Sequence, residues 1–194
     1  MQQGQHSDPG KAGIPAGTSD LLAVVARCRA GERKAQKELY DRFAPVLYPR
    51  IRRYIADLGK AQEILNDSFY KILTHIQAYS GSGSFEGWMH RITINTITDH
   101  LRKNVPFDRM PASDPESHEL PVPETAVGKL SYKELLEVVH ALPEVHRAVF
   151  NLFVFDGYSH KEIATQLNIS ENNSRWHLND ARRRLKEKLD AHMS

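Results

Sequence analysis

The sequence has little cysteine, no long apolar run and no apolar leader. Cys28 is the one cysteine among 194 residues, so an intramolecular disulfide is excluded. No apolar stretch approaches the roughly 20 residues that a membrane-spanning helix needs, and residues 1–18 lack the apolar segment of a signal peptide. We therefore expect a cytoplasmic protein. Cys28 lies in an apolar helical stretch, and we interpret it as a small buried hydrophobe.

Recognisable catalytic motifs are also missing. The histidines are scattered and show no HExxH metal spacing, and there is neither a nucleophile elbow nor a phosphate-binding GxxxxGK. We expect no enzymatic activity, no metal and no cofactor. The formal net charge is only +2, so the overall charge says little about partners, and its distribution along the chain is more informative.

Strand-like alternation is absent, whereas apolar residues recur at helical spacing. The clearest stretch runs from Ala61 to Ile76, with apolar positions at i, i+3, i+4 and i+7. The sequence predicts an all-α protein with two small helical domains, at residues 19–104 and 131–194. Residues 1–18 are predicted to be a disordered tail, and residues 105–130, rich in proline and acidic side chains, a linker that cannot bury enough apolar surface to fold alone.

Several residues mark expected helix boundaries in the first domain. Ser19 is a suitable N-cap for the first helix. Pro45 and Pro49 lie inside the second helical stretch, where a missing N–H donor and a steric clash predict a kink or a short break. Leu58 and Gly59 are expected to end that stretch.

The second domain carries two capping boxes and a helix-turn-helix pattern. Ser131 with Glu134, and Ser159 with Glu162, have the spacing that lets a hydroxyl and a carboxylate each satisfy an orphan N–H. Gly157 suits a left-handed C-cap. A short helix after Ser159, a turn, and a longer helix capped by Ser170 then follow, and the longer helix is predicted to enter a DNA major groove.

A rotation of 100° per residue divides the last helix into an inward apolar face and an outward polar one. Asn side chains can bind adenine and Asp can accept from cytosine, while arginines grip phosphates. The predicted DNA-binding residues are Asn172, Asn173, Arg175, Trp176, Asn179, Asp180, Arg182 and Arg183. A merely solvated basic face is the alternative, and Trp176 either contacts a thymine methyl or folds back on a neighbouring helix.

Two further surfaces are suggestive but ambiguous on pattern alone. The 61–76 helix has an exposed acidic and amide face, which could simply be solvated. Phe85, Trp88 and Arg91 follow a Gly/Ser loop, where aromatics could stack on unpaired bases, although such aromatics are more often core residues.

The order of these segments resembles the sigma-70 family, and specifically its extracytoplasmic-function group. AQEILNDSFYKIL (61–73) resembles region 2.2 of that family, SFEGWMHRITINTITDHLRK (84–103) resembles regions 2.3 and 2.4, and residues 142–189 resemble region 4. The resemblance implies a transcription-initiation subunit that binds core RNA polymerase and promoter DNA and is held by an anti-sigma factor.

The resemblance also implies residue roles. Four residues match the dock on the polymerase: Gln62, Glu63, Asn66 and Asp67. Six match the capture of the melted minus-ten element: Phe85, Trp88, Arg91, Asn95, Asp99 and Arg102. Residues 171–184 match the reader of the minus-thirty-five element. Asn172-Asn173 and Asp180 depart from the usual family pattern, and Gln62 replaces a common acidic residue. The rival hypothesis is a helix-turn-helix regulator that binds duplex DNA without polymerase.

Overall fold

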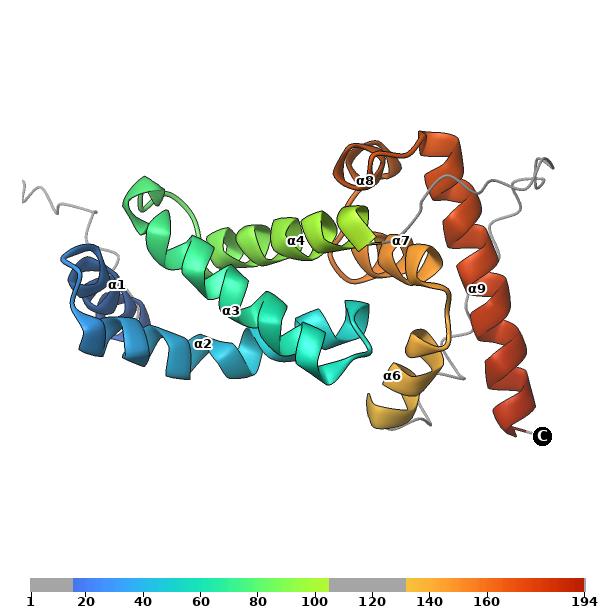
Figure 1. The fold of residues 1–194 in the computed structure, drawn as a ribbon, viewed down its shortest axis with the longest axis horizontal. Helices are drawn as coiled ribbons and strands as arrows, with labels where there is room; N and C mark the ends of the chain where they lie inside the picture. Colours follow the sequence, from blue (N-terminus) through green and yellow to red (C-terminus); the bar gives the residue numbers. More distant parts are fainter. Residues whose placement is uncertain (1–15, 105–131, 194) are drawn as a thin grey trace, which may run out of the picture.

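Helices make up all the regular structure in the part of the chain that the computed structural model describes, residues 16–104 and 132–193. This result confirms the expected all-α class. The first range contains α1 (Ala16–Arg29), α2 (Arg33–Tyr54), α3 (Leu58–Thr74), the 3-10 helix η1 (Ile76–Ala78) and α4 (Phe85–Asn104). The second contains α6 (Tyr132–His140), α7 (Glu144–Val154), α8 (His160–Leu167) and α9 (Glu171–Met193) (Figure 1).

The N-terminal half is built around α3, which packs against both α2 and α4, while α1 crosses α2. The expected stripe on α3 is buried, and it includes Ile64, Leu65, Phe69 and Ile72. Cys28 is only 3% exposed, as the sequence predicted. The buried side chains meet in a core that also takes in Phe43 and Leu47 of α2.

Two expected helix boundaries in this half are wrong. Helix α1 begins at Ala16, so Ser19 lies inside it. Leu58 and Gly59 belong to the first turn of α3, because Asp57 caps that helix by accepting a hydrogen bond from Lys60 N at 2.8 Å. A helix therefore starts where the sequence suggested an end.

The predicted break in α2 is absent, and the helix runs through both prolines. Pro45 and Pro49 lie on its exposed side. The residues whose carbonyls lose an N–H partner there are exposed, so water can replace the missing hydrogen bonds. The buried stripe of Phe43, Leu47 and Ile51 continues past them and holds the helix together.

The C-terminal half is organised around α7, which packs on α9, while α6 and α8 also contact α9. Gly157 adopts φ 73°, in the left-handed region expected of it. Ser131 lies outside the described residues, as do most of the predicted tail and the predicted linker, residues 105–130.

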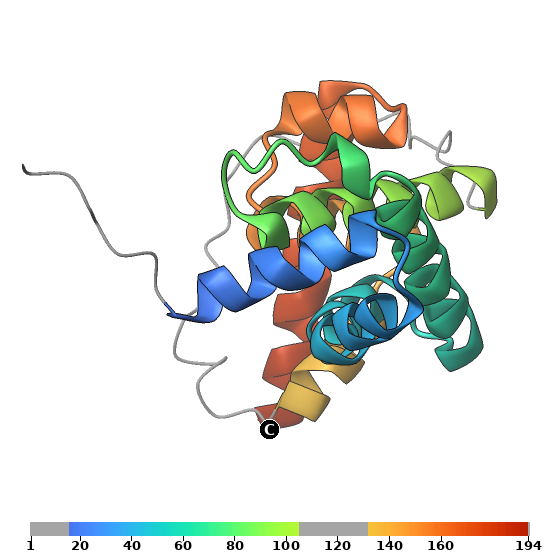
Figure 2. The ribbon, with the colours of Figure 1, turned by 90° about the vertical axis from the view of Figure 1, so that its left-hand side faces the viewer.

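The two halves touch. Helix α2 contacts α6 and α7, and α4 contacts α8. In Figure 1 the green α4 points into the orange helices, and the perpendicular view in Figure 2 again shows α8 beside α4. The buried residues of both halves form one connected cluster. Among the described helices, none is long and apolar enough to cross a bilayer.

Candidate nucleic-acid interface

The helix-turn-helix is held by caps at both of its helix starts. Ser159 Oγ accepts from Glu162 N at 3.3 Å, and Glu162 Oε2 accepts from Ser159 N at 2.8 Å, which confirms the predicted capping box. The Ser159 hydroxyl also donates to Glu162 Oε2 at 2.7 Å, and this hydrogen bond, together with the one from Ser159 N, lowers the pKa of Glu162. Asn168 turns the chain at φ 56°, and Ser170 Oγ then accepts from Asn173 N at 3.0 Å. The caps fix where α8 and α9 begin.

A polar contact joins the two helices of the motif. His160 Nδ1 of α8 lies 2.9 Å from the hydroxyl of Ser174 on α9, and Ser174 is fully buried. The His160 ring also stacks on Phe153 of α7, with ring centroids 4.7 Å apart. The orientation of α9 against α7 and α8 is therefore set by polar and aromatic contacts as well as by the apolar stripe.

The inward face of α9 is as expected at Leu178, Ala181 and Leu185, which are nearly inaccessible to solvent. Asn172, Arg175 and Arg183 are exposed on the opposite side. Asn173, Asn179 and Arg182 are half-buried, and the amide oxygen of Asn173 accepts from the Ser170 hydroxyl at 2.8 Å. The predicted DNA-reading face is therefore narrower than the sequence suggested.

Asp180 does not face outward as the helical rotation predicted. Its side chain is 11% exposed and lies against α7, with Oδ2 2.9 Å from His146 Nε2. It also pairs with Arg183 and, at 2.6 Å, with Arg184 Nε on its own helix. Burial alone would raise the pKa of Asp180, but these arginine contacts outweigh it and the pKa is lowered. In this structure the carboxylate anchors α9 rather than being presented to a base.

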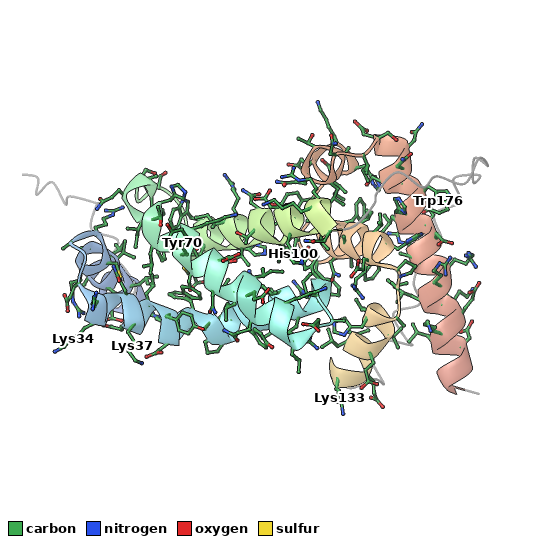
Figure 3. The ribbon with its side chains drawn as sticks, in the orientation of Figure 1. Lys34, Lys37, Tyr70, His100, Lys133 and Trp176 are labelled. Carbon is green, nitrogen blue, oxygen red and sulfur yellow. The ribbon has the colours of Figure 1, made fainter. Side chains whose placement is uncertain are left out.

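Trp176 folds back on a neighbouring helix, which is the second of the two orientations expected from the sequence; the first was contact with a thymine methyl. Its ring packs on His146 of α7 and on His177, with centroids 5.3 and 4.9 Å apart. It remains half-buried on α9, where Figure 3 labels it. The two histidine rings also touch, at 4.7 Å. Burial lowers the pKa of His146, and burial together with the neighbouring His146 lowers that of His177 to about 4.

Two of the predicted DNA-binding arginines on α9 are held by carboxylates one turn away. Arg175 pairs with Glu171 at 3.1 Å, and Arg183 pairs with Glu187 at 2.7 Å. All four side chains are at least 44% exposed. Exposed pairs of this kind contribute about 0–1 kcal/mol each, so a phosphate can replace the carboxylate at little cost.

The aromatic block at the start of α4 is mainly structural. Phe85 is only 3% exposed and contacts Phe43, Tyr79 and Trp88, at 5.5 Å from the last of these. The predicted stacking of a base on Phe85 is therefore wrong for this conformation, because the ring already fills the core. Trp88 is half-buried and retains some accessible surface.

The polar residues of α4 lie along one side of the helix. Arg91, Asn95 and Arg102 are exposed, and Asp99 is half-buried between two cations. Asp99 pairs with Arg102 on the same helix and with Lys71 of α3 at 3.2 Å. All six predicted minus-ten residues thus lie on α4, but Phe85 is buried in the core.

The predicted polymerase-binding residues share the outer face of α3. Gln62, Glu63, Asn66 and Asp67 are all exposed. Gln62 Nε2 donates to Asn66 Oδ1 at 3.1 Å and to Tyr40 Oη of α2 at 3.3 Å. This amide network orders two of the four side chains, whereas Glu63 and Asp67 extend into solvent. Tyr70, one helical turn further on, is 73% exposed and is labelled in Figure 3.

Sequence reasoning missed a cleft between α4 and α8. It has a volume of about 710 Å³, and Arg91 and Asn95 line it on one side while Lys161 and Gln166 line it on the other. Asp156, which precedes the predicted cap Gly157, also lines the cleft. No signal in the sequence connects α4 with α8, because their contacts join residues about 70 positions apart.

Two family models match the chain. Residues 39–106 match sigma-70 region 2, and residues 132–185 match sigma-70 region 4. The chain belongs to the sigma-70 family. The match divides it into a region 2 domain, which contains most of α2 and all of α3 and α4, and a region 4 domain, which contains α6, α7, α8 and most of α9.

Relatives within the family are named as sigma factors, and some of them as extracytoplasmic-function (ECF) sigma factors. The chain is 28% identical over 166 residues to the ECF RNA polymerase sigma factor SigE of Mycolicibacterium smegmatis, an alignment that covers 81% of this chain but 62% of the relative. It is 28% identical to the RNA polymerase sigma-H factor of Pseudomonas aeruginosa, over 73% of this chain and 79% of that one. The family assignment expected from the sequence is confirmed.

A solved structure shares the fold at low identity. The sigma factor RpoE of Bartonella quintana, solved in complex with the anti-sigma factor NepR, aligns with a TM-score of 0.50 at 16% identity, over 91% of this chain and 98% of that one.

Proposed function

We propose that this sigma-70 family member is an alternative sigma factor that binds core RNA polymerase in the cytoplasm and directs transcription from a specific set of promoters. The observation that carries the proposal is the presence, in one chain, of both region 2 and region 4, each with an exposed polar face on the helix that the family uses. A regulator that binds duplex DNA alone has no need of region 2. The proposed role consists of binding and positioning, with no bond made or broken by this chain.

In this proposal α3 docks on the polymerase through Glu63 and Asp67, whose carboxylates are exposed and so lose little hydration on reaching a basic partner. Gln62 and Asn66 are held in register by their own hydrogen bond and add directional contacts. Charge complementarity of this type speeds association and selects the partner more than it adds affinity.

The two DNA contacts differ in kind. Helix α9 presents Asn172 and Asn179 toward base edges, with Arg175, Arg182 and Arg183 as phosphate contacts, in the manner of a recognition helix. Helix α4 presents Arg91, Asn95 and Arg102 to the opened minus-ten strand, with Trp88 as the accessible aromatic.

Control by an anti-sigma factor also belongs to the proposal. It is supported by the likeness to the Bartonella quintana sigma factor, which was solved bound to the anti-sigma factor NepR.

The test is run-off transcription with purified core polymerase on the promoter region of this protein's own operon. We expect specific transcripts that require the protein and that disappear with Asp67→Arg. Glu137→Arg is the matched control, because it reverses an exposed carboxylate on α6, away from the docking face, and it should keep transcription. Tight binding of the protein alone to duplex DNA, with no binding to core polymerase, would instead support the regulator.

A further inference from the structure

The cleft between α4 and α8 is a feature that the proposed polymerase and promoter contacts leave unexplained. Its volume of about 710 Å³ falls within the range of roughly 300–1,000 Å³ that is typical of small-molecule sites. Helix α4 lines one wall with Gly87, Arg91 and Asn95. The turn after α7 and helix α8 line the other wall, with Tyr158 and Lys161 among their residues. The cleft is therefore large enough for a ligand of nucleotide size.

The carboxylates that line the cleft already have partners within the protein. Asp156 has a side chain that is only 2% exposed, and its Oδ1 lies 3.5 Å from Arg53 Nη2 and 3.0 Å from His90 Nε2. Burial alone would raise the pKa of Asp156, but its contacts lower it. Glu162 Oε2 accepts hydrogen bonds from the backbone N and the hydroxyl of Ser159, at 2.8 and 2.7 Å. The cleft is thus not arranged to bind a cation.

Hydrogen-bond donors, in contrast, remain available in the cleft. Arg91 and Lys161 are exposed, and neither side chain forms an ion pair with any residue that the structure describes. Asn95 Oδ1 accepts from Gln166 Nε2 at 3.1 Å, while Asn95 Nδ2 has no partner in the described ranges. The Tyr158 hydroxyl is likewise without a hydrogen-bond partner there, and burial raises its pKa, so that it stays protonated and can donate.

This set of groups fits a phosphate better than other anions. The positive charge of Arg91 acts on the Tyr158 hydroxyl, which shows that these two groups lie close together. Arginine and lysine are the side chains that bind phosphate oxygens in proteins. A phosphate ester carries up to two negative charges at neutral pH, which matches the two unpaired cations. A carboxylate would leave one of them unbalanced.

We propose that the cleft between α4 and α8 binds a phosphorylated small molecule of nucleotide size, whose phosphate oxygens contact Arg91 and Lys161. The Tyr158 hydroxyl and the Asn95 amide supply further donors to the same oxygens. The ligand and the opened minus-ten strand both use Arg91 and Asn95, so they compete for these side chains. Ligand binding follows from the cleft and its donors, and only the competition rests on the proposed function of α4.

The first experiment measures the binding of ADP and GDP to the full chain by isothermal titration calorimetry. The buffer contains no divalent cations, because these would neutralise the phosphates. We expect at least one of the two nucleotides to bind with a dissociation constant below about 1 mM. Inorganic phosphate fills only part of the cleft and should bind at least about tenfold more weakly. Absence of binding by both nucleotides, or equally tight binding of inorganic phosphate, would overturn the proposal.

Two substitutions test the position of the site, one on each wall. Arg91→Ala and Lys161→Ala each remove an exposed cation, so the circular dichroism melt should stay unchanged. Each should weaken nucleotide binding about tenfold or more, because a hydrogen bond between charged groups is lost. Lys133→Ala is the matched control and should keep the affinity, since it removes an exposed cation of α6, which Figure 3 shows away from α8. Equal affinity of all three variants would place the nucleotide outside the cleft and overturn the site.

The second experiment distinguishes a small ligand from DNA. A fluorescent single-stranded oligonucleotide that covers the minus-ten element is titrated with the free protein, with and without saturating nucleotide. We expect the nucleotide to weaken strand binding. If the nucleotide binds through Lys161 but strand affinity does not change, the ligand site stands and the proposed strand-binding role of Arg91 is refuted. If the strand binds through Lys161 while neither nucleotide binds, the cleft is a DNA site and the proposal is overturned.

Discussion

Lowering the pH should destabilise the region 4 domain through His177. This side chain is 4% exposed, packed between Trp176 and His146, and its pKa is lowered from 6.5 to about 4 by burial and by the neighbouring histidine. In the unfolded chain the imidazole is free to take up a proton near its ordinary pKa. Between these two values the unfolded state therefore binds more protons than the native state, so stability decreases as the pH falls.

The size of the effect follows from the two pKa values. At pH 7 the unfolded imidazole is mostly neutral, so its protonation lowers the free energy of unfolding only slightly. At pH 5 nearly all unfolded molecules carry the proton while the native ones do not. The difference between the two conditions amounts to about 2 kcal/mol of unfolding free energy from this one group. That loss is a large fraction of the stability of a small domain.

The assay is urea denaturation, followed by circular dichroism at pH 7 and at pH 5, of the unchanged protein and of His177→Gln. The variant removes the titrating group at similar volume, so its loss of stability between the two conditions should be smaller by about 2 kcal/mol. His100→Gln, on α4 and labelled in Figure 3, is the control and should keep the full pH dependence. An identical pH dependence for the unchanged protein and His177→Gln would refute the reasoning.

Two further substitutions test the corrected roles of site residues. Phe85→Ala should lower the free energy of unfolding by about 3–5 kcal/mol, as expected for a core aromatic. A ring that only stacks on bases would leave thermal stability unchanged and reduce promoter opening alone. Asp180→Asn should lower stability by about 1–3 kcal/mol, because His146 and two arginines lose a charged acceptor. If Asp180 reads a base instead, the melting temperature stays constant and the promoter sequence preference changes.

Local rules predict the helices and several of their ends. The apolar stripe of α3, the Ser159–Glu162 capping box and the left-handed Gly157 follow from spacing and backbone sterics within a few residues. The same local rules misplace the start of α3, because Gly59 resembles a helix end while the Asp57 cap overrides it. They also give too much weight to the two prolines of α2, since burial of the opposite face outweighs two solvent-facing hydrogen bonds.

The site is harder to predict, because orientation depends on what a helix packs against. A rotation of 100° per residue places Asp180 beside Arg183 on the polar side of α9, but α7 packs at the edge of that face and brings His146 within 2.9 Å of the carboxylate. The role of Phe85 is ambiguous in the sequence, because an aromatic side chain after a flexible loop can either stack on an unpaired base or pack in the hydrophobic core. In the structure Phe85 belongs to the core because its ring packs against Phe43 and Tyr79. No local sequence pattern shows that these two rings lie beside it.

The domain boundary is beyond the reach of patterning for a further reason. Contacts such as Asp156 with Tyr54 and Gln166 with Asn95 link residues that are far apart in the chain and polar on both sides. An apolar interface leaves an unexplained stripe in the sequence, whereas a polar one resembles ordinary surface in each domain taken alone. The position of the polar contacts is determined by a few directional groups on both domains, and these groups come together only in the folded chain.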